Sequence, residues 1–471
     1  MGISLSPATL LNGQGIDVSS LVQQVISETS GQLTGWQNEL ATLQSQSSDL
    51  TIVNGDLSNL QTAVQALSDP LGVLTTLTAT SSDSGVLTAT TTSAATAGTH
   101  QIVVDNLATP GLVYSNDFAG GAAASILPSG ASSGEIDLQI GGSGGTTQAI
   151  NITAGSNDTL NTLATYINAQ NWGVQASVVT DANGATLALV SQSTGSAGAL
   201  AITSNNTSLN FNAPSGGANA SLTIDGVPYS SASNTITGAL PGVTLNLAGA
   251  DPGTPVQLTV GANTTQITNA INNFVSAYNQ VIGDINQEFT VNSSTNSLGP
   301  LGTDGSLGEL QSSLLSDAAY AISGNSGYVN LASLGINTNN DGTLTVDSTQ
   351  LNSVLASNPS ALENFFQNSS ATGFANNFNT DLTGLTDLTA GPINVDLSQN
   401  AAQQQDLTNT ITNFQTQLTA EQTSLTTQFD QVNASLQAYP LLLQEITSTL
   451  GTLGTGGSST SSSSPTLTSG L

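Results

Sequence analysis

The chain lacks cysteine, lysine and arginine, and its one histidine, His100, is the only side chain that can become cationic. Thirty acidic residues leave a formal net charge of −30 on 471 residues. Because no cationic side chain can neutralise phosphates, we expect no nucleic-acid binding and no direct binding to an acidic membrane surface. The absence of cysteine excludes a disulfide framework and a thiolate metal site.

Long apolar runs are also missing. No stretch approaches the length of a membrane-spanning helix. The N-terminus has neither the cationic segment nor the sustained apolar segment of a cleaved secretory signal. If the protein leaves the cell, we therefore expect a route without a cleaved signal peptide.

Motifs for catalysis or cofactor binding are scarce. His100 lies in a predicted strand with no nucleophile motif, so a structural role is favoured. Residues 339–347 (NNDGTLTVD) lack the ligand ladder and terminal glutamate of a calcium loop, which favours a hairpin turn. The glycine-rich residues 141–145 have no lysine, which excludes a P-loop. We expect no enzyme activity, no metal ligands and no cofactor.

Apolar residues recur three and four positions apart near both ends of the chain. The pattern predicts a short helix capped by Asp17 or a nearby serine, then one long helix or two over residues 33–67, with a phase slip between residues 43 and 50. Another long helix is predicted from residue 407, interrupted at Pro440. Such narrow apolar seams cannot bury themselves alone, so the ends should pack against each other or against other copies.

The apolar side chains of these seams are the candidate assembly contacts. In a protein with an apolar seam near each end, the residues that pack in the core and those that mediate assembly are expected to be largely the same. The candidates are Ile16, Val18, Leu21, Leu33, Trp36, Leu40, Leu43, Leu407, Ile411, Phe414, Leu418, Leu425 and Phe429.

The middle of the chain alternates threonine with apolar residues. Residues 86–107 predict a strand, residues 159–170 a helix, and residues 174–191 a hairpin that turns at Asp181 to Gly184. Helical spacing returns over 267–289, and Asn358 followed by Pro359 opens a short helix. The expected fold class is α+β and multidomain, with a discontinuous helical, coiled-coil stem from both termini and inserted β-rich head domains.

These patterns divide the chain into four regions. A terminal helical region comprises residues 1–50 and 405–455, and a mixed helical stem domain comprises 51–110 and 256–404. Residues 111–255 form the β-rich head, and the serine-rich residues 456–471 predict a flexible tail.

Six segments carry a collinear resemblance to one known family. They are GQGIDVSSLVQQVISE at 13–28, SSDSGVLTATTTSAATAGTHQIVVDNLA at 81–108, SLTIDGVPYSSASNTITGALPGVTLNLAG at 221–249, INNFVSAYNQVIGDIN at 271–286, LASLGINTNNDGTLTVDSTQLNSVLASNPSALENFF at 331–366 and QTSLTTQFDQVNASLQAYPLLLQEI at 422–446. Together they resemble the bacterial flagellar filament cap protein, or hook-associated protein 2, family. The resemblance covers nearly the whole chain and is weakest over residues 110–220.

The resemblance implies a homo-oligomeric, extracellular cap at the distal tip of the flagellar filament. Terminal helices would dock into the filament end, and β-rich domains would form a plate under which exported flagellin folds and inserts instead of being lost. The implied partners are further copies of the chain, flagellin, the filament tip with its hook-associated proteins, and the flagellar type III export apparatus. Without lysine or arginine, hydrogen bonds and apolar packing would have to carry these contacts.

Two alternative functions stay open. Another axial protein, either flagellin or a hook–filament junction protein, would share the helical ends, but the segments GVTLNL and LGINTNNDGTLTVD favour the cap. A secreted surface adhesin is suggested by the β-rich region alone, and an oligomer without affinity for filaments would favour it.

Overall fold

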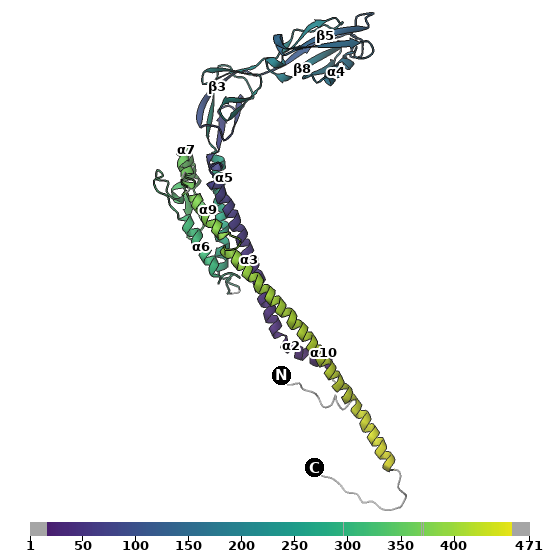
Figure 1. Ribbon diagram of the computed structural model, residues 1–471, viewed down its shortest axis with the longest axis vertical. Coiled ribbons are helices and arrows are strands. Elements are labelled where there is room, and N and C mark those ends of the chain that lie inside the picture. The colour runs from purple at the N-terminus through teal and green to yellow at the C-terminus, as the bar shows by residue number, and fades with distance from the viewer. Residues whose placement is uncertain (1–16, 295, 369, 371, 455–471) are drawn as a thin grey trace, which may run out of the picture. The chain divides into compact units, whose positions relative to one another are not determined.

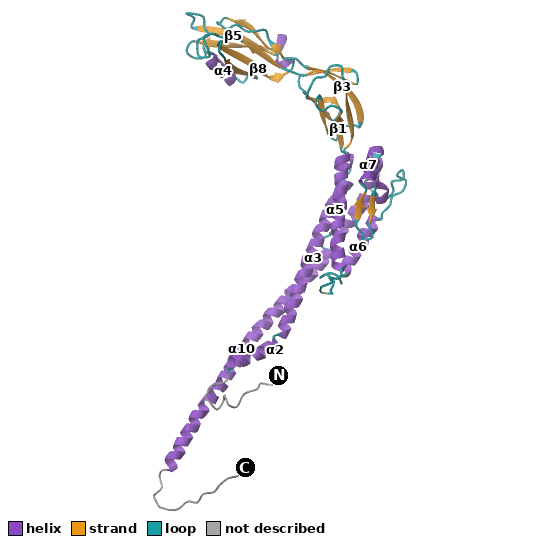
Figure 2. Cartoon of the chain, turned by 180° about the vertical axis from the view of Figure 1, so that it is seen from behind, coloured by secondary structure: helices purple, strands orange, loops and turns teal. Residues whose placement is uncertain are grey.

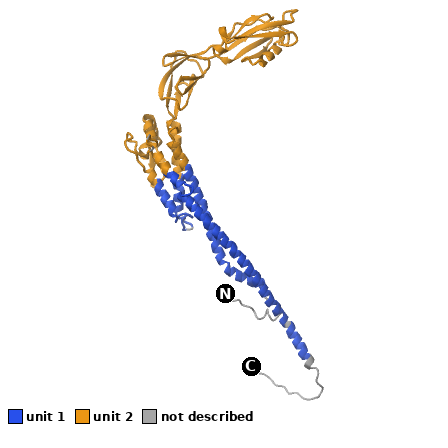
Figure 3. Cartoon of the chain, in the orientation of Figure 1, with its two compact units in different colours: residues 1–59, 280–314, 381–471 blue, residues 60–279, 315–380 orange. Residues whose placement is uncertain are grey.

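The computed structural model describes residues 17–294, 296–368, 370 and 372–454 (Figure 1). Two compact units divide the chain (Figure 3): unit 1 comprises residues 1–59, 280–314 and 381–471, and unit 2 comprises residues 60–279 and 315–380. Each unit is therefore assembled from segments far apart in sequence. Ile16 and the tail expected at 456–471 lie outside the described residues.

Unit 1 is built mainly from helices, as the purple ribbons in Figure 2 show. It contains α2 (Val18–Thr29), the first part of α3 (Gly31–Ser68), the end of α5 (Thr264–Phe289), most of α6 (Gly305–Ala318), the end of α9 (Phe374–Leu385) and α10 (Pro392–Gly454). The predicted long N-terminal helix is one continuous helix, α3. It ends just before Asp69 and Pro70, as expected from the restricted backbone of a residue that precedes proline.

The phase slip within α3 coincides with a change in burial. Leu33, Trp36, Leu40 and Leu43 are half-buried, whereas Leu50, Val53 and Leu57 are buried with at most 2% of their surface exposed. The helix stays continuous, so the slip turns a new face of α3 towards its neighbours without breaking it.

The expectation that Pro440 interrupts the C-terminal helix was wrong, because α10 runs through this position to Gly454. A proline removes one backbone hydrogen bond but leaves those of the turns on either side. Strong helix formers, Leu441, Leu442 and Leu443, follow at once and favour continuation of the helix.

In unit 2, one β-rich body combines a five-stranded sheet, in the order β1-β15-β3-β11-β12, with a three-stranded sheet, β13-β14-β2. Its strands are β1 (Leu77–Ser81), β2 (Leu87–Thr91), β3 (Gly98–Asn106), β11 (Ala220–Ile224), β12 (Val227–Ser231), β13 (Thr235–Leu240), β14 (Val243–Leu247) and β15 (Val256–Ala262). Side chains from both sheets, including Leu87, Ile102 and Leu245, form one buried cluster.

The strand expected over residues 86–107 is two strands, β2 and β3, and β1 precedes them. Residues between β2 and β3 turn through a hydrogen bond from the Ala95 amide to the Thr92 carbonyl, which an alternation of threonine and apolar residues does not reveal. β3 pairs with β11, so the sheet joins segments on both sides of the boundary expected at residue 110.

A second β-rich body is inserted between β3 and β11. Its sheets are β10-β4-β8-β7 and β6-β5-β9. The elements are β4 (Pro110–Tyr114), β5 (Ser133–Ile140), β6 (Thr146–Thr153), α4 (Leu160–Ala169), β7 (Val174–Thr180), β8 (Ala185–Thr194), β9 (Leu200–Asn205) and β10 (Ser215–Gly216). The predicted hairpin is confirmed, because β7 and β8 pair antiparallel and the Asp181 carboxylate accepts the Gly184 amide hydrogen.

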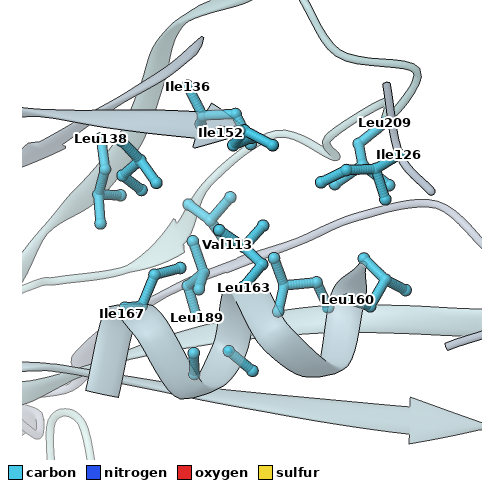
Figure 4. Close-up of a cluster of buried hydrophobic side chains, with 14 of the residues drawn as sticks. Val113, Ile126, Ile136, Leu138, Ile152, Leu160, Leu163, Ile167, Leu189 and Leu209 are labelled. Carbon is cyan, nitrogen blue, oxygen red and sulfur yellow. The ribbon is translucent and has the colours of Figure 1, made fainter. Parts of the chain in front are cut away.

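Helix α4 packs its apolar face into the core of this inserted body. Figure 4 shows Leu160, Leu163 and Ile167 on one side of α4, and all three are at most 1% exposed. The helix was predicted over residues 159–170, and Thr159 caps it in a reciprocal pair with Thr162.

The rest of unit 2 is mainly helical. It contains β16 (Ile336–Thr338), β17 (Leu344–Val346), α7 (Ser348–Ser357) and α8 (Pro359–Phe366), together with parts of the helices shared with unit 1. Unit 2 as a whole also has short 3-10 helices, at Val73–Thr75 and Leu331–Leu334 and, within the inserted body, at Gly142–Gly144 and Ser196–Gly198. The turn between β16 and β17 is the hairpin turn expected within residues 339–347. Helices at both ends and sheets between them confirm the α+β multidomain class.

An aromatic cluster holds this helical part of unit 2 together. Its buried rings, Phe274, Tyr278, Phe365, Phe366, Phe374 and Phe378, have neighbouring centroids 5.1–6.3 Å apart. Burial, and then the nearby Asp317, raise the pKa of Tyr278 above its ordinary value.

We expect Phe274→Ala to lower the free energy of unfolding of this part by about 3–5 kcal/mol, because the substitution leaves a cavity among packed rings. Urea denaturation followed by near-ultraviolet circular dichroism would measure the loss. Tyr439→Ala is the control, since Tyr439 is 64% exposed and its removal should change stability by no more than about 0.5 kcal/mol. Equal effects of the two substitutions would contradict the aromatic core.

Candidate assembly surface

Within unit 1, α2 and the first part of α3 pack antiparallel against α10, and we call this contact the seam interface. The rings of Trp36 and Phe414 meet edge to face with centroids 5.2 Å apart. Nearer the middle of α3, the Gln404 amide donates to the Leu43 carbonyl at 3.3 Å. As the position on α3 rises, the partner on α10 falls, which is the signature of antiparallel helices. The two ends therefore pack against each other, one of the two outcomes that the seams predicted.

Helix α2 continues the seam interface towards the N-terminus. Val18 and Val22 are 8% and 2% exposed, and together with Gln422 and Thr426 of α10 they line a shared cleft. Asp17 caps α2 as predicted, accepting the Ser20 amide hydrogen at 3.1 Å. This bond, followed by the hydroxyl of Ser19, lowers the pKa of the Asp17 carboxyl.

A set of uncharged amides, which we call the amide ladder, links α3 to α10. It comprises Gln46, Asn54, Asn394, Asn400 and Gln404. Asn54 donates to Asn394 at 3.2 Å, and Asn400, which is only 7% exposed, donates to Gln46 at 3.5 Å. These residues are not among the candidates from the sequence, although Gln46 lies three positions after Leu43 and Gln404 three before Leu407, which continues the spacing of the apolar seam.

The candidate assembly contacts occupy the seam interface to different depths. Among those that the structure describes, Val18, Ile411 and Leu418 are buried, at 8%, 7% and 8% exposure. The half-buried ones are Leu21, Leu33, Trp36, Leu40, Leu43, Leu407, Phe414, Leu425 and Phe429. These side chains already contact their own chain, and their role in assembly stays a prediction.

The exposed apolar surface lies farther along α10. The terminal apolar segment, which we define as residues 432–450, carries Val432, Tyr439, Leu441, Leu442, Leu443, Ile446 and Leu450, each 49–68% exposed. Figure 1 shows α10 continuing past the start of α2. Consecutive helical residues point about 100° apart. Three neighbouring leucines that are all more than half exposed therefore lie where no described residue covers the helix on any side.

Other kinds of site find little support in the part of the chain that the structure describes. No three histidine or acidic side chains gather there as a metal site would need, and no helix is both long and apolar enough to cross a membrane. His100 pairs with Asp225, whose carboxylate is 2.8 Å from the imidazole. The hydrogen bond with His100, and then the one from the Gln101 amide, lower the pKa of Asp225, which is consistent with a structural role for His100.

Family models match both halves of this architecture. The model for the N-terminus of flagellar hook-associated protein 2 matches residues 14–110, and the model for its C-terminus matches residues 217–439. The chain belongs to the flagellar hook-associated protein 2 family. A flagellin hook IN motif also matches residues 137–193, within the inserted body where the resemblance was weakest.

Of two known members of the hook-associated protein 2 family, one is similar to most of this chain and the other to about a third of it. The B-type flagellar hook-associated protein 2 of Pseudomonas aeruginosa is 29% identical, over 93% of this chain and 96% of the relative. The polar flagellar hook-associated protein 2 of Vibrio parahaemolyticus is 32% identical, over 37% of this chain and 26% of that protein.

A solved structure points the same way. The D1-D2-D3 domains of the flagellar cap protein FliD from Escherichia coli align with 75% of this chain and 99% of their own, at 27% identity and a TM-score of 0.53. The assignment to the flagellar filament cap proteins is therefore confirmed. The family is a structural one.

For this hook-associated protein 2 family member, we expect Phe414→Ala to expose Trp36 and to shift its fluorescence emission to longer wavelength, because the Phe414 ring packs directly against the indole. Loss of the ring pair should lower the free energy of unfolding by about 0.5–1.5 kcal/mol beyond the effect of the lost buried area. The measurement needs a Trp172→Phe background, since Trp172 is the second tryptophan.

Phe429→Ala is the matched control, because this half-buried ring also belongs to the seam interface but lies 15 positions farther along α10. It should leave the emission of Trp36 unchanged. An unshifted spectrum for Phe414→Ala, or equal shifts for both variants, would contradict the pairing of α3 with α10.

Proposed function

We propose that this chain caps the distal tip of the flagellar filament as a homo-oligomer and docks into the filament through the terminal apolar segment of α10. The observation that carries the proposal is the exposure of Leu441, Leu442, Leu443 and their apolar neighbours on a helix that the described chain leaves uncovered. Family membership supports a location at the filament tip, since the Escherichia coli structure that aligns with this chain is that of a flagellar cap protein.

The physical argument concerns what such a helix needs. The terminal apolar segment exposes large apolar side chains between polar ones, and a large exposed apolar surface usually marks a binding site. Burying one leucine stabilises a contact by about 1.5–3 kcal/mol relative to exposure. Several such side chains in one segment therefore favour insertion into a groove formed by other helices, as in other helix-in-groove complexes.

We further propose that the β-rich bodies face flagellin, help exported subunits to fold and insert, and prevent their loss. Lysine and arginine are absent, so these contacts would use apolar groups, neutral hydrogen bonds, or basic residues that the partner supplies. The chain would act outside the cell, having left through the flagellar type III export apparatus without a cleaved signal peptide, and would adjoin hook-associated proteins of the filament.

The first test replaces Leu441, Leu442 and Leu443 together by glutamine. We expect the variant to fold, because these side chains are all more than half exposed, and yet to fail to restore filament growth in cells that lack the cap. The measurement compares filament length with the amount of unpolymerised flagellin in the culture medium, which should rise as it does without any cap.

The matched control changes Thr447, Ser448 and Thr449 to glutamine, which alters as many exposed residues on the same part of α10 without removing apolar surface. This control should cap normally. Normal capping by the triple leucine variant would show that docking does not depend on the terminal apolar segment. Intact oligomers that bind no filaments even without substitutions would favour a surface adhesin instead.

The second test concerns assembly of the homo-oligomer. Copies with a net charge of −30 repel each other, and salt screens this repulsion beyond about 8 Å at physiological ionic strength. We therefore expect oligomers of the full chain to become more stable as salt rises, as sedimentation at low and high salt would show. Dissociation on adding salt would indicate ion pairs at the interface and argue against this account.

A further inference from the structure

The terminal apolar segment of α10 carries a regular repeat. Some of its apolar residues alternate at spacings of four and three, and we call this set the terminal seam: Val432, Leu436, Tyr439, Leu443, Ile446 and Leu450. The same alternation begins upstream with Leu425 and Phe429 of the seam interface. An apolar period of 3.5 residues is the signature of a helix that supercoils with another helix of the same period.

The terminal seam lies open in the part of the chain that the structure describes. Val432 and Ile446 are 49% and 51% exposed, and Tyr439, Leu443 and Leu450 are 60–64% exposed. Leu436 is half-buried. Helix α10 runs without a break through all six positions, so the seam is one straight stripe on a continuous helix. Such a stripe needs a second helix to bury it.

The charges beside the terminal seam indicate which partner it fits. The flanking e and g positions of a coiled coil commonly carry the charged residues that select the partner. Here these positions hold only uncharged residues: Asn433, Ser435, Pro440, Leu442, Thr447 and Thr449. The one acidic residue within 432–450, Glu445, lies about 130° around the helix from the middle of the seam.

This arrangement favours a second copy of the chain over a basic partner. A basic helix would be matched by carboxylates at the flanking positions, which the sequence does not place there. Identical copies bring the same residues face to face, so any carboxylate beside the seam would meet its own counterpart and repel it. With 30 acidic residues and no lysine or arginine, the chain can meet itself closely only where carboxylates are absent.

The residue types in the terminal seam indicate how many helices meet. In the heptad repeat, Leu436, Leu443 and Leu450 occupy the a positions, and the β-branched Val432 and Ile446 occupy d positions. Leucine at a with isoleucine at d favours bundles of three or four helices over pairs. Copies in a cap would share one orientation, which makes the bundle parallel.

We propose that the terminal seam joins the α10 helices of several copies in a parallel, in-register coiled coil. This inference rests on the homo-oligomer of the proposed function and assigns a surface to it. Leu441 and Leu442 lie outside the terminal seam and remain for docking into the filament. One helix thus presents one face to its own copies and another to the filament.

Cross-linking through single introduced cysteines tests the coiled coil, because the chain has no cysteine of its own. A lone thiol in each chain can be linked only to the same residue of another copy. We expect Val432→Cys and Ile446→Cys to give covalent dimers when the purified full chain is treated with a short bifunctional maleimide. Both positions should react, because parallel helices in register keep each d residue beside its counterpart.

Matched controls place the thiol two positions farther along, on the face of α10 away from the terminal seam. Ala434→Cys and Ser448→Cys should give about tenfold less dimer, because the bundled helices separate their thiols. All four replaced side chains are exposed in the single chain, so the variants should fold.

Dimer yields that are equal at seam and control positions would overturn the coiled coil, and so would the absence of dimers from both seam variants. Dimers that form only when the two seam variants are mixed would also contradict it, since residue 432 meets residue 446 in antiparallel helices.

Filament growth in cells that lack the cap, measured with the unmodified chain, tests the proposed function separately. Seam dimers without restored growth would support the coiled coil and contradict the cap. Restored growth without seam dimers would support the cap and overturn the coiled coil.

Discussion

Every carboxylate in this protein must be accommodated without lysine or arginine, and this constraint shapes the whole structure. Asp17, Asp341 and Asp387 accept hydrogen bonds from backbone amides and hydroxyls within a few residues, which lowers the pKa of each carboxyl. Such bonds close caps and turns but do not join distant segments. Cohesion between distant segments therefore rests mainly on apolar packing and on neutral hydrogen bonds, with the contacts of Asp225 to His100 and to the Gln101 amide among the exceptions.

The contact between the two ends of the chain combines apolar packing with neutral hydrogen bonds. Trp36 and Phe414 supply apolar packing, and the amide ladder supplies hydrogen bonds that require a particular alignment of α3 with α10. A buried polar residue in a helical seam commonly fixes register at some cost in stability. Neutral amides can serve this purpose in a chain of one charge sign, where a carboxylate would meet only other carboxylates.

Periodicity and turn chemistry were enough to predict the local elements. Asp17 as a cap, α4 with Thr159 before it, and the β7–β8 hairpin all follow from residues within about ten positions of each other. Pairings between distant segments could not be predicted this way. The residues around β3 or Asn400 do not indicate which distant segment each of them contacts. Among the candidate assembly contacts, spacing identified the seam but not its depth, since burial depends on where the antiparallel partner ends.

The junction of the inserted body with its sheet has an architectural consequence. The chain leaves the sheet at the end of β3 and returns at the start of β11, and Asn106 lies opposite Ser221 in that pairing. The points where the chain leaves and re-enters the sheet are therefore neighbours. The sheet places almost no constraint on the length of the segment that connects them. Loop closure costs rise only slowly with length, so the intervening residues could be shortened, extended or exchanged for another independently folding module while the sheet keeps its register. The inserted body is thus a module attached to the sheet at one place, between β3 and β11, and can diverge without any change in the pairing of these two strands.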